Sequence, residues 1–309
     1  MTQTINPSAA AQPAAPQPSA PQPTAQPAPP PSSGSPARQD KQATWRAVGI
    51  GLILLGAFVL GFLAYLYGIS AIQEARAQSN SYATLRGQLS QGIAPLGVTT
   101  PGSPVAILNI PAIGVTNVVV VEGTSPQNLE LGPGHVRSTP LPGQSGVSAI
   151  FGRRATFGAP FGRLGELRVG DKLTVTTGQG RASYIIVARG DSRHLVDDPA
   201  PDRLLLFTAC SAVIPTSYCY VDADLTSSPQ PDPGGRPAIT TAETPLSGDG
   251  SVLVLTMMWA LALVIISVAG TVAAARWSPW LAYLAAAPVA LAVLWNLYQS
   301  LAALLPNVY

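Results

Sequence analysis

The chain has 309 residues and a formal net charge of +2, from 17 lysines and arginines against 15 aspartates and glutamates. A charge this small, without a basic run or interleaved aromatic residues, argues against a nucleic-acid-binding surface. The chain has two cysteines, Cys210 and Cys219, and two histidines, His135 and His194. So few candidate ligands fit neither a disulfide framework nor a zinc site with paired CxxC motifs, and we expect no metal and no cofactor.

Residues 1–45 are rich in proline, alanine, glutamine and serine. Such a composition cannot bury enough apolar surface to offset the entropy of ordering, so we expect a disordered tail with polyproline II character. We interpret it as a spacer. The alternative is a ligand for a proline-binding module.

Residues 47–68 form an uncharged apolar run that would extend roughly 33 Å as a helix, enough to cross a bilayer core. Arg38, Lys41 and Arg46 precede the run, which places the N-terminus in the cytoplasm. A cleaved signal peptide is a poorer interpretation, because the run is long and begins deep in the chain.

Two further uncharged runs, residues 251–275 and 280–305, flank a short turn that contains Arg276. The arginine fits the cytoplasmic side of a membrane. We therefore predict three spans, with the polypeptide between the first and second spans on the extracytoplasmic side. The predicted location is the cell membrane, as a multi-pass protein.

Between the first two spans lie a stalk at residues 69–100, a folded domain at residues 101–226 and a proline-containing linker at residues 227–249. The domain contains short runs rich in β-branched and aliphatic residues, such as Val118–Val121 and Leu204–Phe207, separated by glycine, proline and aspartate. This pattern is typical of a β-sandwich or β-barrel.

Several stretches of the domain resemble the sortase family, particularly its actinobacterial class E type. They are Val105-Ala106-Ile107-Leu108-Asn109-Ile110-Pro111, Gly132-Pro133-Gly134-His135, Gly152-Arg153-Arg154-Ala155-Thr156-Phe157-Gly158-Ala159-Pro160-Phe161, Leu164-Gly165-Glu166-Leu167 with Gly170-Asp171, and Leu206-Phe207-Thr208-Ala209-Cys210. The third stretch is similar to the family's "GHRTTYGAPF" segment. The resemblance implies a mainly β protein, with an eight-stranded sortase-like barrel joined to three transmembrane helices and a disordered tail.

Sortases are extracytoplasmic transpeptidases that cut a sorting signal and join it to an amine at the cell surface. The resemblance therefore implies a surface protein or peptide with a sorting signal as partner, and a cell-wall amine as acceptor. The chemistry requires a cysteine thiolate as nucleophile, a histidine as acid and base, and an arginine that stabilises the oxyanion.

Only one of these three groups is retained. Cys210 stands at the nucleophile position, although a buried cysteine at a strand end is the structural alternative. Arg153 replaces the family histidine, and a guanidinium cannot exchange protons near neutrality. Tyr218 replaces the family arginine, and a phenol donates one hydrogen bond without a positive charge.

Other residues could compensate for these losses. His135 could act as a displaced acid and base, or it could be a turn histidine bonded to nearby backbone. Arg153 or Arg154 could take the place of the oxyanion arginine, and Arg153 could favour a Cys210 thiolate by its charge. His194 is expected to be a solvated loop residue.

Cys210 and Cys219 are nine positions apart on two consecutive predicted strands. They could be free thiols, or they could form a disulfide if their Cα atoms lie within about 7 Å. A disulfide would remove the nucleophile.

Two hypotheses of function follow. In the first, the protein is a sortase-like member of the cell envelope that binds or acts on sorting-signal peptides and is catalytically impaired, or a pseudoenzyme. In the second, it is an active cysteine transpeptidase with a rearranged acid and base such as His135. A third and weaker hypothesis makes the membrane helices the functional part and the barrel a sensor.

Overall fold

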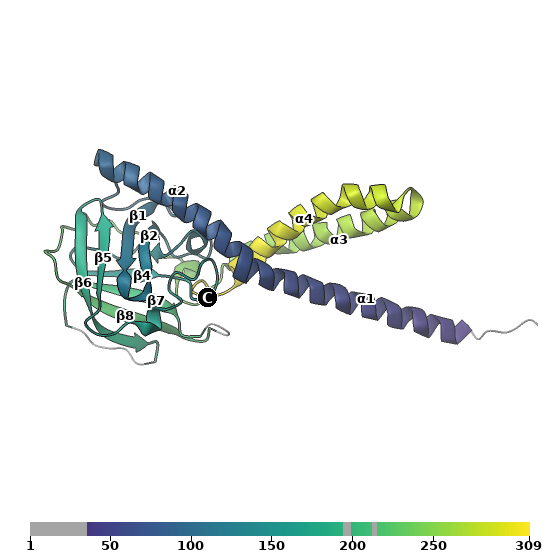
Figure 1. Ribbon diagram of the computed structural model, residues 1–309, viewed down its shortest axis with the longest axis horizontal. Helices are drawn as coiled ribbons and strands as arrows, with labels where there is room; N and C mark the ends of the chain where they lie inside the picture. The colour runs from purple at the N-terminus through teal and green to yellow at the C-terminus, as the bar shows by residue number, and fades with distance from the viewer. Residues whose placement is uncertain (1–35, 194–198, 212–214) are drawn as a thin grey trace, which may run out of the picture. The chain divides into compact units, whose positions relative to one another are not determined.

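A computed structural model describes residues 36–193, 199–211 and 215–309 (Figure 1). Most of the predicted disordered tail and all of His194 lie outside these residues. The first described helix, α1 (Pro36–Ala64), begins inside the segment that we predicted as tail. Residues 1–53 form one unit and residues 54–309 another, and the contacts below all lie within the second.

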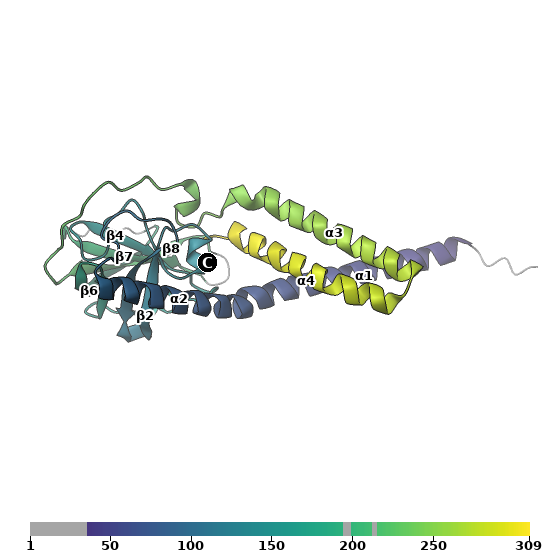
Figure 2. The same ribbon diagram turned by 90° about the horizontal axis from the view of Figure 1, so that it is seen from above.

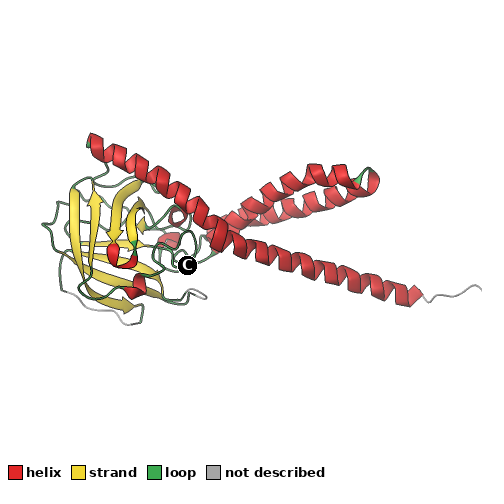
Figure 3. Cartoon of the chain, in the orientation of Figure 1, coloured by secondary structure: helices red, strands yellow, loops and turns green. Residues whose placement is uncertain are grey.

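The folded domain is a closed barrel of eight strands in the order β1-β2-β3-β4-β7-β8-β6-β5. The strands are β1 (Pro104–Ile110), β2 (Val115–Glu122), β3 (Gly134–His135), β4 (Val147–Phe151), β5 (Lys172–Thr177), β6 (Gly180–Asp191), β7 (Arg203–Ala209) and β8 (Tyr218–Leu225). Figure 3 shows these strands in yellow as one group. The predicted eight-stranded barrel is thereby confirmed.

Strand pairing in the barrel is mixed. The pairs β2–β3 and β4–β7 are parallel, whereas the remaining neighbours are antiparallel. Alternate residues of β7 are buried, as expected for a strand that contributes one face to a core. Leu204 and Leu206 join Val221 of β8 in the main apolar cluster of the barrel.

A long helix leads into the barrel. After α1 comes a π-helical turn, η1 (Tyr65–Ile69), and then α2 (Ser70–Gln91). Figures 1 and 2 both show α2 lying along the barrel. Leu85 packs with Ile107 of β1 and Val119 of β2. The Gln78 amide adds hydrogen bonds to both backbone groups of Val119, at 3.0 and 2.7 Å, so α2 is fixed to the first hairpin.

Helices α3 (Leu253–Arg276) and α4 (Pro279–Leu304) form an antiparallel pair after the barrel. Within the described residues, three helical stretches are long and apolar enough to cross a membrane: Val48–Gln91, Gly250–Arg276 and Pro279–Leu304. This confirms the three predicted apolar helices. Tyr298 of α4 donates a hydrogen bond of 2.9 Å to the Phe58 carbonyl, which joins the last helix to the first.

Candidate functional site

Cys210 follows directly after β7, where the apolar strand pattern ends. The β7–β8 register places Ala209 opposite Tyr218 and Thr208 opposite Cys219. The Cys210 amide donates 3.0 Å to the Ser217 carbonyl, so pairing continues past the strand end. Cys210 is bonded to Cys219, with the Cα atoms 4.9 Å apart. The structure thus shows the disulfide, and neither cysteine is a free thiol.

A cavity of about 440 Å³ opens beside this disulfide. Both cysteines line it, together with Arg154, Leu164, Gly165, Arg189, Gly190, Asp191, Thr208, Tyr220 and Val221. The Arg189 guanidinium is directed to the Gly165 carbonyl at 2.9 Å. The wall therefore combines polar and apolar groups around two sulfur atoms.

Arg153 does not line this cavity. Its side chain is fully buried and donates hydrogen bonds to the carbonyls of Leu129 at 3.3 Å and Pro126 at 3.0 Å. The guanidinium also lies 4.5 Å from the ring centroid of Phe157. These contacts satisfy the buried cation through carbonyl dipoles and a π-face, so the residue at the family's histidine position supports packing rather than the cysteine.

Electrostatics agree with this placement. Burial lowers the pKa of Arg153 to about 10, while the nearby Glu130 opposes the shift. Burial raises the pKa of Glu130 to about 7, and the charge of Arg153 counteracts part of that rise. A group with a pKa near 10 keeps its charge at neutral pH and cannot serve there as a proton shuttle.

The glycine before Arg153 explains part of this geometry. A Cβ atom on Gly152 would lie 2.3 Å from the ring of Phe161, a separation that no side chain tolerates. Only glycine allows the end of β4 to approach this buried ring. Gly152 therefore sets the position of the backbone from which the Arg153 side chain extends.

Tyr218 begins β8 and packs edge-on against Phe207, with ring centroids 5.8 Å apart. Its backbone pairs with Ala209. Tyr218 is absent from the described lining of the cavity. The residue at the family's arginine position thus extends an aromatic contact across the sheet, and its predicted site role stays a prediction.

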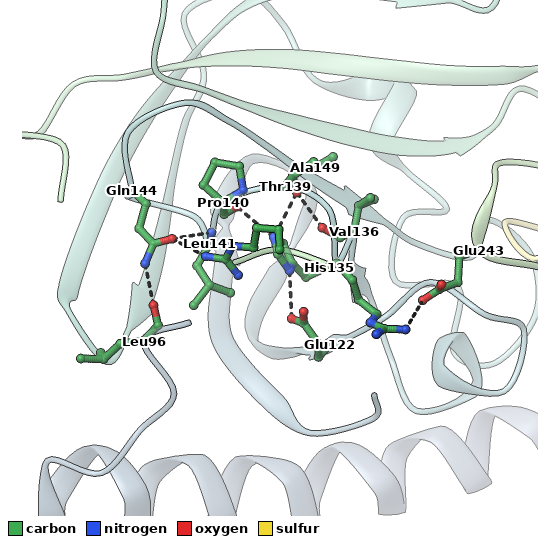
Figure 4. A network of polar contacts seen from close by, with 12 residues as sticks. Leu96, Glu122, His135, Val136, Thr139, Pro140, Leu141, Gln144, Ala149 and Glu243 are labelled. Atoms are coloured by element: carbon green, nitrogen blue, oxygen red, sulfur yellow. Dashed lines mark hydrogen bonds and ion pairs between the residues drawn. The ribbon is translucent and has the colours of Figure 1, made fainter. Parts of the chain in front are cut away.

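His135 lies inside the barrel and is fully buried (Figure 4). Its Nδ1 is 2.9 Å from a Glu122 carboxylate oxygen, and its Nε2 is 2.9 Å from the Pro140 carbonyl and 3.2 Å from the Thr139 hydroxyl. Both ring nitrogens therefore have hydrogen-bond partners inside the protein. His135 is also absent from the described lining of the cavity. The structure therefore does not bring this predicted surrogate to Cys210.

Arg154 is the arginine that the structure brings to the cysteine. It lines the cavity, and its Nη1 donates 3.2 Å to the carbonyl of Ala209, the residue before Cys210. From the sequence, either Arg153 or Arg154 could replace the oxyanion arginine, and Arg154 needed no special role because it matches a residue that the family already carries. The alternation of side chains near a strand end could have distinguished the two candidates, because neighbouring residues point to opposite sides.

The closed barrel of mixed pairing, whose seventh strand leads into Cys210, agrees with the sortase-like barrel that the sequence resemblance implied. A sequence model described as "Sortase domain" matches residues 108–223. Sortase D of Bacillus subtilis (strain 168) is 37% identical over 86 residues, which cover 28% of this chain and 41% of that protein. The match thus spans less than half of that relative's length.

Two solved sortase structures align with part of this chain. Sortase E from Streptomyces avermitilis is 34% identical and aligns with 47% of this chain and 100% of its own, with a TM-score of 0.36. Sortase E1 from Streptomyces coelicolor, solved with a tripeptide in the active site, is 26% identical over 42% of this chain and 92% of its own, with a TM-score of 0.37. The chain belongs to the sortase family.

Proposed function

We propose that this protein is a membrane-anchored, class E-like sortase-family member of the cell envelope whose barrel binds sorting-signal peptides and whose catalysis is impaired. One observation carries the proposal: Cys210 is bonded to Cys219, while Arg153 and His135 are buried in contacts of their own. The peptide class follows from membership of the family, and the cavity beside Cys210 supplies a place for it.

The missing chemistry can be stated step by step. Acylation needs a thiolate that attacks the scissile carbonyl. A sulfur atom in a disulfide is bonded to a second sulfur, so it is not a thiolate and is a poor nucleophile. Expulsion of the amine needs a proton donor. None of the described residues that line the cavity is a histidine. Loss of one oxyanion donor alone typically costs about 3 kcal/mol of transition-state stabilisation, so several such losses together leave binding as the favoured activity.

Membrane orientation is part of the proposal. The first span leads into the barrel, and the segment after the third span returns to it, since the Thr156 hydroxyl donates 3.0 Å to the Tyr309 carbonyl. Three crossings with the barrel outside place the N-terminus and the α3–α4 turn on the same side. The basic residues Arg46 and Arg276 then both face the cytoplasm.

One observation favours the alternative, an active cysteine transpeptidase with a rearranged acid and base such as His135. Arg154 lines the cavity at Cys210, so reduction of the disulfide would release a thiol beside a cation. Such a neighbour favours the thiolate and could also donate to an oxyanion. A cell-wall amine would be the acceptor in this case.

Both proposals can be tested on the full chain in lipid nanodiscs. A fluorescent sorting-signal peptide reports binding, and an electrophilic analogue of the same peptide reports a reactive thiol through the mass of the Cys210 fragment. The favoured proposal expects binding without an adduct in the oxidised chain, and no joining of peptide to an added amine after reduction. Joined product that disappears in Cys210→Ala and in His135→Gln would establish the alternative. An absence of peptide binding in both redox states, by the full chain and by a chain without residues 306–309, would reject the favoured proposal.

A further inference from the structure

The residues that follow α4 do not leave the barrel. Asn307 and Val308 are both fully buried, although they come directly after a helix that is apolar enough to cross a membrane. Burial this complete needs specific partners, because ordering a terminal segment loses conformational entropy. The segment Pro306–Tyr309 is called the terminal segment below.

Val308 is the apolar anchor of the terminal segment. It belongs to a cluster with residues of β4 and β7 and of the loops beside them. The buried members are Leu129, Val136, Ala149, Phe151 and Ala209. Ala209 is the residue before Cys210, but neither Ala209 nor Val308 is among the described residues that line the cavity.

Backbone hydrogen bonds hold the terminal segment against the end of β4. The Arg154 amide donates 3.2 Å to the Val308 carbonyl, and the Ala155 amide donates 3.4 Å to the Tyr309 carbonyl. These two bonds are made by the main chain, so they do not depend on which side chains the segment carries. Arg154 therefore contacts the terminal segment with its amide and the Ala209 carbonyl with its side chain.

Asn307 fastens the terminal segment from the other side. Its side-chain amide donates to the carbonyls of Thr124 at 3.0 Å and Thr244 at 2.8 Å. Its backbone amide donates 2.8 Å to the Ser247 carbonyl. The barrel, the linker before α3 and the residues after α4 thus meet at one side chain.

From these contacts we infer that the terminal segment is a tethered ligand. It covers the face of β4 and β7 that carries Phe151, Phe207 and Ala209, and it must leave before a peptide in the cavity at Cys210 can extend over this face. The inference rests on the proposed peptide-binding function. An intramolecular ligand has an effective concentration on the order of millimolar, so a free peptide binds the full chain more weakly than it binds a chain without the terminal segment. Movement of α4 would then control access to the site.

A pentapeptide with the sequence of Leu305–Tyr309 serves as the probe. Its affinity is measured by fluorescence anisotropy for the full chain in nanodiscs and for a chain without residues 306–309. We expect the shortened chain to bind the pentapeptide at least about tenfold more tightly, and a pentapeptide with aspartate in place of valine to bind neither. Equal binding to both chains overturns the inference.

A second measurement does not depend on deletion. Hydrogen exchange at the Arg154 and Ala155 amides is compared in the wild-type chain, in Val308→Asp and in Val169→Asp, an exposed control position with 68% of its surface accessible. We expect exchange at these two amides to accelerate at least about tenfold in Val308→Asp only, with barrel amides such as Leu206 unchanged. Loss of protection throughout the barrel overturns the inference, because the segment would then be part of the core.

These outcomes are distinct from failure of the proposed function. If the shortened chain binds the pentapeptide but no sorting-signal peptide, the tethered ligand stands and the proposed peptide class is wrong. If sorting-signal peptides bind the full chain and the shortened chain equally, the tether is wrong and the binding function stands.

Discussion

The bond between Cys210 and Cys219 joins the residue after β7 to the second residue of β8, at Cα positions 4.9 Å apart. The two residues are diagonal neighbours, because Cys219 pairs with Thr208 and the Cys210 amide bonds to the Ser217 carbonyl. Diagonal side chains on one face of an antiparallel pair lie within reach of each other. The pairing that positions the cysteine therefore also brings it to a partner that removes its nucleophilicity.

Removal of the disulfide should cost stability. A cross-link across nine positions restricts the unfolded chain, and the loop-entropy relation gives about 2–3 kcal/mol for a loop of this size. We expect the Cys219→Ser chain and the reduced wild-type chain to unfold at similarly lowered urea concentrations in detergent. An unchanged midpoint in both would show that the barrel does not rely on this link.

Restoring the family residue at position 153 should not restore catalysis. Histidine is too short to reach the Leu129 and Pro126 carbonyls that Arg153 satisfies, so Arg153→His should lose about 2–4 kcal/mol of unfolding free energy. Thermal unfolding measures that loss. The decisive assay is peptide joining by the Arg153→His, Cys219→Ser double variant. Product formation there would mean that the side chain at position 153 can reach Cys210.

Arg154 should control the reactivity of a released thiol. In a Cys219→Ser background, we expect Arg154→Gln to slow alkylation of Cys210 near neutral pH by about threefold to tenfold, because a cation next to the sulfur favours the thiolate. Arg163→Gln is the matched control, since that arginine pairs with Glu166 on the surface at 2.7 Å. Equal alkylation rates in both variants would show that Arg154 does not influence the reactivity of Cys210.

Glu130 should make stability depend on pH. Its pKa is about 7 in the folded chain against an ordinary value of 4.5. The unfolded chain therefore releases this proton first, and the free energy of unfolding falls as pH rises from about 4.5 to about 7. The loss is at most about 3 kcal/mol and stays constant at higher pH.

The Glu130→Gln variant isolates this contribution. Its melting temperature should decline less than that of the wild-type chain between about pH 5 and about pH 8. Parallel profiles for the two proteins would show that the carboxyl does not titrate in this window.

The barrel and the apolar helices could be predicted because they depend on local patterns. Runs such as Val118–Val121 indicate strands by composition alone, and residues 251–275 indicate a span by length and lack of charge. Cys210 could be placed at a strand end for the same reason. The family's motif order then supplied the arrangement of the strands, which local patterns do not encode.

The direction of side chains and the long-range contacts could not be predicted. The motif aligned Arg153 with a catalytic position, but its burial depends on carbonyls from a loop more than twenty positions earlier in the chain. Asn307 bonds to Thr124 across a sequence separation of 183 residues, and no local pattern announces such a contact. The choice between free thiols and a disulfide required the Cα separation.

The proposed function is that of an envelope protein that binds a peptide without joining it to an amine. The most direct measurement is mass-spectrometric detection of joined product from the full chain in nanodiscs, under reducing conditions, with a sorting-signal peptide and an amine acceptor. We predict saturable peptide binding, with no joined product above the level of the Cys210→Ala chain. Joined product that depends on Cys210 would contradict the account.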